Sequence, residues 1–136
     1  MTALNSRVLI EGRAEGPVLK LGADISLWGG VDPRTGTIID ARHPQYGQSI
    51  AGKILAMNRS IGSSSGSSIL LELLQRRCGP LGIILIEVDF IVTLGVVVAR
   101  EMKFGDIPVV QVARADLSLL PGTVRINPNG KIESLV

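Results

Sequence analysis

A run of small hydroxyl residues is the first place in this sequence where chemistry can be expected. Residues 62–68 have the sequence GSSSGSS, and the apolar run 69–74 follows at once. Serine before such a run is typical of a helix N-terminus, whose free N–H groups attract anions, and glycine lets a ligand approach the backbone. A serine hydroxyl there can donate to a carboxylate or exchange a proton. The same composition is also typical of a flexible loop that only caps a helix.

Two common functions of glycine- and serine-rich loops are excluded by the residues around this run. It lacks the Gly-Lys-Ser/Thr ending of a P-loop. A hydrolase-type serine nucleophile would need the single histidine, His43, as its base, and nothing in the sequence indicates what would orient that ring.

A second candidate is the stretch 28–40, which has the sequence WGGVDPRTGTIID. Ordering so many turn residues costs conformational entropy unless something holds the loop. In one interpretation Asp32 and Thr35 form a tight turn, and Trp28 covers the edge of the core. In the other, Gly29 and Gly30 lie against a ligand or the backbone of a partner.

Two further side chains, those of His43 and Arg59, have functional groups suited to catalysis or binding, but their sequence neighbours do not indicate such a role. His43 lies three residues after Asp40 in a loop with a proline, and it is either a catalytic group or an ordinary surface histidine. Arg59 is the cation nearest to the serine run, and its guanidinium can pair with a substrate carboxylate.

The elements that must position these residues are strands in the first half of the chain and two main helices later. Helices are expected at 69–74 and at 89–101, the second capped by Asp89, with a buried strand at 82–87 between them. Other strands are expected at 7–11, 17–21, 37–40, 48–57, 107–112, 122–126 and 130–134. We therefore predict a single α/β domain over residues 1–136 that is rich in β-structure.

The composition limits the classes of function. The net charge is +2 and aromatic residues make up 3%, so neither a basic patch nor a stacking platform for nucleic acid is expected. One cysteine, Cys78, and one histidine leave no metal site of the Cys or His type. No apolar segment approaches the roughly 20 residues that span a membrane, and no signal peptide is evident, so we expect a cytoplasmic protein. The apolar share of 46% with only 19% charge suggests surface buried against a partner.

Several motifs in order resemble one family. They are SLWGGVDPRTGTIIDARHP at 26–44, AGKIL at 51–55 and GSSSGS at 62–67, followed by LLELL, GIILIE, the Leu94-Gly95 turn and IPVV. Together they cover about residues 7–120, and they resemble the small subunit, or swivelling domain, of the aconitase X family. The resemblance implies a swivelling β/β/α domain of the aconitase-like type.

The same resemblance implies a dehydratase made of two subunits. In that family a larger subunit holds an iron or iron–sulfur centre, and the small subunit closes over it and supplies a serine. By this resemblance the chain itself binds no cofactor or metal, its substrate is a small carboxylate, and its partner is the large subunit. We expect an exposed apolar face through which the chain can form a homo-oligomer when that partner is absent.

The motif positions imply which residues take part. Ser63 matches the catalytic serine, as a base or proton relay. The residues expected to bind substrate are Gly62, Ser64, Ser65, Arg59, Trp28, Gly29, Gly30, Asp32 and His43. Trp28, the serine run and His43 are expected to face the large subunit.

Two substrate classes divide the family. The Trp28 motif and the GSSSGS form resemble the bacterial members, which dehydrate cis-3-hydroxy-L-proline, more than the archaeal members, which dehydrate phosphomevalonate. The sequence departs from the common pattern at Ile61, where many members have Arg, and at Asn58, where Pro is common. A non-catalytic swivel domain that only binds a partner or a small anion, and a free-standing domain that binds a small molecule, are the remaining alternatives.

Overall fold

The computed structural model describes residues 3–135. The strands are β1 (Ala3–Asn5), β2 (Arg7–Ile10), β3 (Ala14–Lys20), β4 (Ile25–Ser26), β5 (Ile54–Met57), β6 (Ser60–Ile61), β7 (Gly82–Leu85), β8 (Val109–Gln111), β9 (Thr123–Ile126) and β10 (Lys131–Ser134). The helices are α1 (Leu27–Gly30), α2 (Gly66–Gln75), α3 (Phe90–Glu101) and α4 (Arg114–Leu119). The expected α/β class with two main helices is confirmed.

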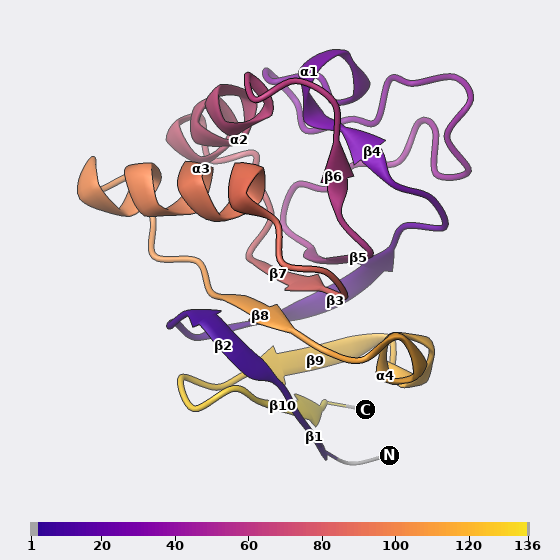
Figure 1. Cartoon of the computed structure of the whole chain (residues 1–136), viewed down its shortest axis with the longest axis vertical. Helices are drawn as coiled ribbons and strands as arrows, with labels where there is room; N and C mark the ends of the chain where they lie inside the picture. Colours follow the sequence, from indigo (N-terminus) through magenta and orange to yellow (C-terminus); the bar gives the residue numbers. More distant parts are fainter. Residues whose placement is uncertain (1–2, 136) are drawn as a thin grey trace.

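Most of the strands form one mixed sheet in the order β1-β10-β9-β3-β5-β7-β8-β2 (Figure 1). Neighbours among β3, β5, β7 and β8 are parallel, and the other neighbours are antiparallel. β1 and β2 stand at opposite ends of this order, although only Ser6 separates them in the chain. The sheet therefore curls until its two edges meet at Ser6.

The curled sheet has apolar side chains on both faces, which explains the aliphatic sequences of its central strands. All residues of β5 and β7 are buried. Because side chains alternate between faces along a strand, one set points inside the curl and the other points toward the helices. The inner set includes Ile54, Ala56, Ile84, Val110, Val124, Ile126 and Ile132. The outer set, with Leu55, Met57 and Leu85, packs in one cluster with Leu70, Leu73, Val92 and Val96 of α2 and α3.

The two main helices lie side by side over the sheet (Figure 1). Gly95 allows this approach, because a Cβ there would lie 3.0 Å from the carbonyl oxygen of Ser67. The predicted cap of α3 is confirmed, since the Asp89 carboxylate accepts from the N–H groups of Ile91 and Val92 at 3.0 and 3.2 Å. Helix α2 begins at Gly66, earlier than expected, and its N-cap residue Ser65 makes no side-chain capping bond.

Several predicted strands are wrong or shorter. Only Ile54–Met57 of the predicted strand 48–57 is a strand, because the chain turns at Gly52, where φ is +70°. The predicted strand 37–40 is reduced to isolated bridges, Val31 with Ile38 and Thr37 with Ser49. The short strands β1, β4 and β6 and the helix α4 were not predicted. Within residues 3–135 no helix is both long and apolar enough to cross a membrane.

Candidate functional site

The serine loop, which we define as Gly62–Ser65, connects β6 to the start of α2. Ser63 is exposed, and its Oγ accepts a hydrogen bond of 3.1 Å from the N–H of Ser65. Its carbonyl oxygen accepts from the N–H of Gly66 at 2.9 Å. In the described chain the backbone N–H groups of Ser63 and Ser64 donate no hydrogen bond. The loop therefore presents a hydroxyl and free N–H groups at the positive end of a ten-residue helix.

A two-strand sheet brings the tryptophan segment beside this loop. β4 pairs in parallel with β6, with Ser26 opposite Ile61. Gly62 has φ +90°, and a Cβ on it would lie 2.6 Å from Ser26 Oγ. The Ser26 hydroxyl donates to the carbonyl oxygen of Trp28 at 2.8 Å. Two segments that are about 35 residues apart in sequence are therefore in contact at the start of α2.

The Trp28 side chain is exposed, and the backbone bends at Gly29 directly after it. The Trp28 side chain is 59% exposed, so it does not cover the core edge. Gly29 has φ +84° and an open position around it, so this φ is what requires glycine. Gly30 is buried, and its carbonyl oxygen accepts from the N–H of Ile39 at 2.8 Å. The four-residue element α1 is therefore not a regular helix, because the backbone of Trp28 and Gly29 is non-helical.

Asp32 shapes the turn that follows. Its Oδ1 accepts from the N–H of Arg34 at 2.9 Å, and its carbonyl oxygen accepts from the N–H groups of Thr35 and Gly36. The hydrogen bond from the Arg34 N–H is the main reason that the pKa of Asp32 lies below its ordinary value. These contacts correspond to the tight-turn interpretation of the segment.

The expected presentation of His43 on the surface is wrong, because the residue is only 6% exposed. Nε2 lies 3.0 Å from the carbonyl oxygen of Ala23, and Nδ1 accepts from the N–H of Gln45 at 3.0 Å. With both nitrogens engaged, Nε2 carries the proton. The ring holds loop 41–47 against the residues after β3, and this leaves no nitrogen for a substrate.

Arg59 lies just before the serine loop in the chain, and Ser64 and Ser65 lie within the loop. Arg59 directly precedes β6 and is half-buried, and its Nε donates to the carbonyl oxygen of Ser60 at 2.9 Å. Ser64 and Ser65 are exposed beside Ser63. Their roles in substrate binding stay predictions.

Sequence reasoning missed the residues that hold the loop in place. Asp89 was recognised as a helix cap, but its carboxylate also accepts from the N–H and the hydroxyl of Ser60, each at 2.6 Å. Ser67 was counted among the loop serines, yet its hydroxyl donates to the carbonyl oxygen of Ile91 at 2.6 Å. A short polar residue flanking an N-cap carries no local signal for such long-range bonds.

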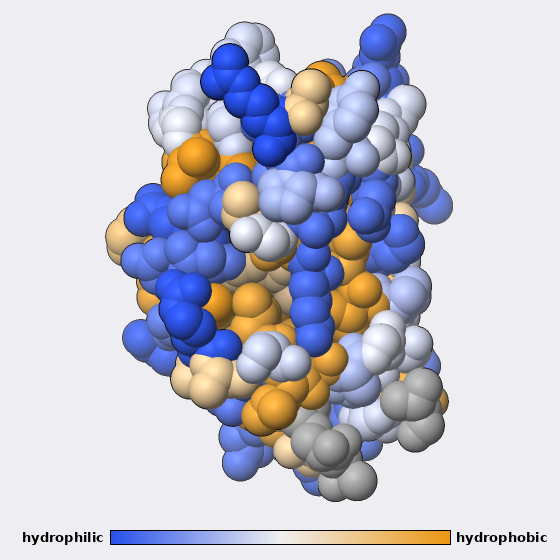
Figure 2. Space-filling view, turned by 90° about the vertical axis from the view of Figure 1, so that its right-hand side faces the viewer, coloured by the Kyte–Doolittle hydropathy of each residue, from blue (hydrophilic) through white to orange (hydrophobic). Residues whose placement is uncertain are grey.

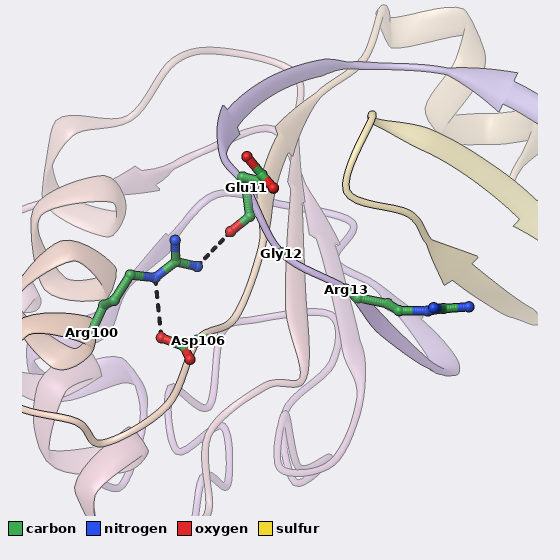
Figure 3. A pocket seen from close by; sticks show the side chains of 5 residues that line it. All are labelled: Glu11, Gly12, Arg13, Arg100 and Asp106. Carbon is green, nitrogen blue, oxygen red and sulfur yellow. Dashed lines mark hydrogen bonds and ion pairs between the residues drawn. The ribbon is translucent and has the colours of Figure 1, made fainter.

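A separate hollow lies at the other end of α3. It has a volume of about 490 Å³ and is lined by Glu11, Gly12, Arg13, Arg100 and Asp106 (Figure 3). Arg100 donates to the carbonyl oxygen of Glu11 at 2.5 Å, and its Nε lies 3.3 Å from Asp106 Oδ1. These bonds tie the end of α3 to the chain after β2, and the lining contains none of the predicted site residues.

The described residues do not offer a set of ligands for a metal ion or cluster. Among residues 3–135, no group of three or more His, Cys, Asp or Glu side chains lies close enough to hold a metal. Cys78 is half-buried, and its thiol contacts the carbonyl oxygen of Pro33 at 3.7 Å. The residues present therefore do not fit the iron centre that the resemblance implies for the whole enzyme.

Comparison with known proteins decides the family. A family model described as the aconitase X swivel domain matches residues 3–134. The chain belongs to the aconitase X swivel domain family. The family expected from the WGGVDP and GSSSGS motifs is thus confirmed.

Relatives of this swivel domain have two kinds of name. A cis-3-hydroxy-L-proline dehydratase of Hypocrea jecorina is 42% identical over 93% of this chain, which corresponds to 21% of that protein. The swivel domain thus spans about a fifth of the length of that relative. A phosphomevalonate dehydratase small subunit of Thermococcus gammatolerans is 38% identical, with 97% of each chain covered.

Solved structures agree with the fold of the swivel domain. A chain of the crystal structure of Thermococcus kodakaraensis aconitase X in its holo-form has a TM-score of 0.88 and 37% identity, with both chains fully covered. A solution NMR structure of a UPF0107 protein has a TM-score of 0.82 and 30% identity, covering 98% of this chain and 99% of that one.

Proposed function

We propose that this swivel domain is the small subunit of an aconitase X-type dehydratase, that it supplies Ser63, and that the substrate is cis-3-hydroxy-L-proline. The observation that carries the proposal is the exposed Ser63 hydroxyl at the start of α2, in a chain whose relatives are named as dehydratases.

Ser63 is suited to move a proton because its surroundings favour the alkoxide. Its Oγ already accepts the N–H of Ser65, and a hydrogen bond to the charged form stabilises that form. The positive end of the α2 dipole acts in the same direction. In the proposed reaction the alkoxide takes the proton from the carbon next to the carboxylate. A C=C bond forms as the hydroxyl group leaves the neighbouring carbon, and the enamine tautomerises to a cyclic imine.

The free backbone N–H groups provide a place for the substrate carboxylate. Those of Ser63 and Ser64 have no acceptor in the described chain, and both residues are exposed. Two N–H groups at a helix start bind a carboxylate well, because the bonds are charge-assisted and the dipole adds to them. Holding the carboxylate there would bring the adjacent carbon close to Ser63 Oγ.

The rest of the active site is proposed to come from a large subunit that also carries the iron centre. Such a centre would be held by that subunit, and it would supply Lewis-acid chemistry there. The swivel domain offers an apolar surface for that subunit around the serine loop, where Ile61 is 45% exposed and Trp28 projects. Phe90, Leu94 and Val97 add an exposed apolar stripe along α3. Another side of the molecule also shows apolar side chains among hydrophilic ones (Figure 2).

The choice of hydroxyproline rests on identity and on charge. The hydroxyproline dehydratases of Hypocrea jecorina and Pseudomonas aeruginosa are each 42% identical to this chain over the matched residues. Arg59 is the only cation in residues 58–66, and its Nε is engaged by Ser60. A phosphorylated substrate would gain more from an Arg at position 61, where this chain has Ile61. The phosphomevalonate reaction is the second candidate, favoured by the small-subunit relatives of equal length.

The test is turnover by the complex of this chain with its large subunit, purified without oxygen and loaded with iron. We expect dehydration of cis-3-hydroxy-L-proline, and we expect Ser63→Ala to lower kcat about 1,000-fold, since positioned proton transfer contributes about 10²–10⁴-fold. Ser68→Ala is the matched control, because Ser68 is exposed in the first turn of α2 but outside the loop. It should leave kcat within about twofold.

Two results would contradict parts of this proposal. Turnover of phosphomevalonate alone would replace the substrate and keep Ser63. An assembled complex in which Ser63→Ala is as active as the Ser68→Ala control would leave the chain as a non-catalytic swivel that only binds its partner.

A further inference from the structure

The serine loop is tied at its entrance to the first turn of α3. Ser60 is completely buried just before the loop, and both its N–H and its hydroxyl donate to Asp89 Oδ2 at 2.6 Å. The other carboxylate oxygen, Oδ1, accepts from the N–H groups of Ile91 and Val92. One buried carboxylate therefore receives four hydrogen bonds, two from β6 and two from α3.

The loop is tied at its exit to the same helical turn. The Ser67 hydroxyl donates to the carbonyl oxygen of Ile91 at 2.6 Å. Gly66 packs directly on Ile91, because a Cβ on Gly66 would lie 3.0 Å from the Ile91 side chain. Both ends of the serine loop are thus fixed to residues 89–91, while the loop itself remains exposed.

We propose that Asp89 is a positioning residue for Ser63: its carboxylate, with Ser60 and Ser67, clamps both ends of the serine loop on the first turn of α3. This proposal rests on the proposed function, because positioning is useful only if Ser63 acts in the reaction. A reacting group that moves by about 1 Å can lose about 10²-fold in rate, so a clamp of this kind sets kcat.

Asp89 does more than a helix cap requires. A cap needs one oxygen that accepts from the second or third N–H of the helix, and Oδ1 fills that role. Oδ2 makes no bond to α3, and it accepts hydrogen bonds only from the N–H and the hydroxyl of Ser60. The two roles can be separated, because serine is a good N-cap with a single side-chain oxygen. Asp89→Ser keeps the cap and removes the acceptor of the two Ser60 bonds.

The experiment uses the complex of this chain with its large subunit and measures kcat and KM for cis-3-hydroxy-L-proline. We expect Asp89→Ser to lower kcat about 10- to 100-fold and to raise KM as well, because the loop that it positions carries both the proton acceptor and the N–H groups proposed for the substrate carboxylate. Ser60→Ala, which removes one of the two bonds, should lower kcat by a smaller factor. The double variant should be no slower than Asp89→Ser, since the two residues act as one unit.

The matched control is Thr93→Val, which removes a hydrogen bond of 2.7 Å from Thr93 Oγ1 to the carbonyl oxygen of Asp89 in the same helical turn. It should leave kcat within about twofold, because it does not touch the loop. If Thr93→Val lowers kcat as much as Asp89→Ser does, the effect is general loss of helix stability and the clamp is refuted. Wild-type kcat in both Asp89→Ser and Ser60→Ala also refutes it.

A second measurement does not depend on activity. In the isolated chain, amide hydrogen exchange at Ser65 and Gly66 reports the order of the loop, because both N–H groups bond to Ser63. We expect these amides to exchange at least tenfold faster in Asp89→Ser, with those of the α3 interior unchanged. Unchanged exchange overturns the clamp. If the wild-type complex dehydrates none of the tested substrates, the proposed function fails while the exchange data still decide the clamp.

Discussion

The contact between Gly62 and Ser26 leads to a quantitative prediction for the substitution Gly62→Ala. Gly62 has φ +90°, and an added Cβ would lie 2.6 Å from Ser26 Oγ and 3.2 Å from Ser26 Cβ. Gly47 is a matched control, since it has φ +87° and nothing within 4 Å of the position of its missing Cβ. Alanine at either position has the same unfavourable positive φ. Only at position 62 would its Cβ also collide with a neighbouring side chain, that of Ser26.

The expected losses of unfolding free energy follow from these distances. A non-glycine residue in left-handed backbone costs about 1–2 kcal/mol, and the lower entropy of unfolded alanine returns about 0.4–1 kcal/mol. Gly47→Ala should therefore lose about 1 kcal/mol. Gly62→Ala must in addition displace the Ser26 hydroxyl from its 2.8 Å bond to Trp28, which costs about 1 kcal/mol, and shift the Ser26 Cβ by a few tenths of an ångström. Its total loss should be about 2–3 kcal/mol.

The measurement is urea unfolding of the isolated chain, followed by circular dichroism. In the background Ser26→Ala, which removes the hydroxyl, Gly62→Ala should lose about 1 kcal/mol less than in the wild type. The contact between β4 and the serine loop would be refuted if Gly62→Ala and Gly47→Ala lost the same unfolding free energy. It would also be refuted if Gly62→Ala lost as much in the Ser26→Ala background as in the wild type.

Two further substitutions test local features by the same unfolding measurement. Arg77, at the end of α2, has φ +60° while its N–H bonds to the carbonyl oxygen of Leu74. Arg77→Gly should therefore stabilise the chain by about 0.5 kcal/mol, and any loss of stability would contradict this interpretation. The lowered pKa of Asp32 stabilises the fold above about pH 3.8, its ordinary pKa, and this contribution is lost as the pH falls through the folded-state value. Asp32→Asn should therefore lose less stability than the wild type between pH 7 and pH 3, and equal losses would argue against a shifted carboxyl.

The parts of the site that could be predicted are those with a local signal. The serine run before an apolar stretch predicted a helix start, and Asp89 before a β-branched run predicted a capped helix. Both predictions depend on residues within one or two turns of each other, where sequence spacing is a direct guide to contact.

The contacts that assemble the site could not be predicted, because they join distant residues through very short elements. β4 and β6 have two residues each, too few for an alternating pattern. The burial of His43 depends on the carbonyl oxygen of Ala23, 20 residues away. The predicted strand 48–57 was too long for a related reason: the N–H of Ile50 bonds to the carbonyl oxygen of Gly36 in a loop and not to a neighbouring strand.

The pairing of β1 with β10 has a consequence for how genes can encode this domain. Ala3 lies opposite Glu133, so the two ends of the fold leave the molecule together, at the end away from the serine loop (Figure 1). A connecting peptide can therefore join either end to another polypeptide without crossing the loop. The same domain can serve as a separate subunit or as one segment of a longer chain, and its relatives include both arrangements: one is covered to 97% of its length and another to 21%. Joining or splitting the genes at these ends requires no change of sequence near Ser63.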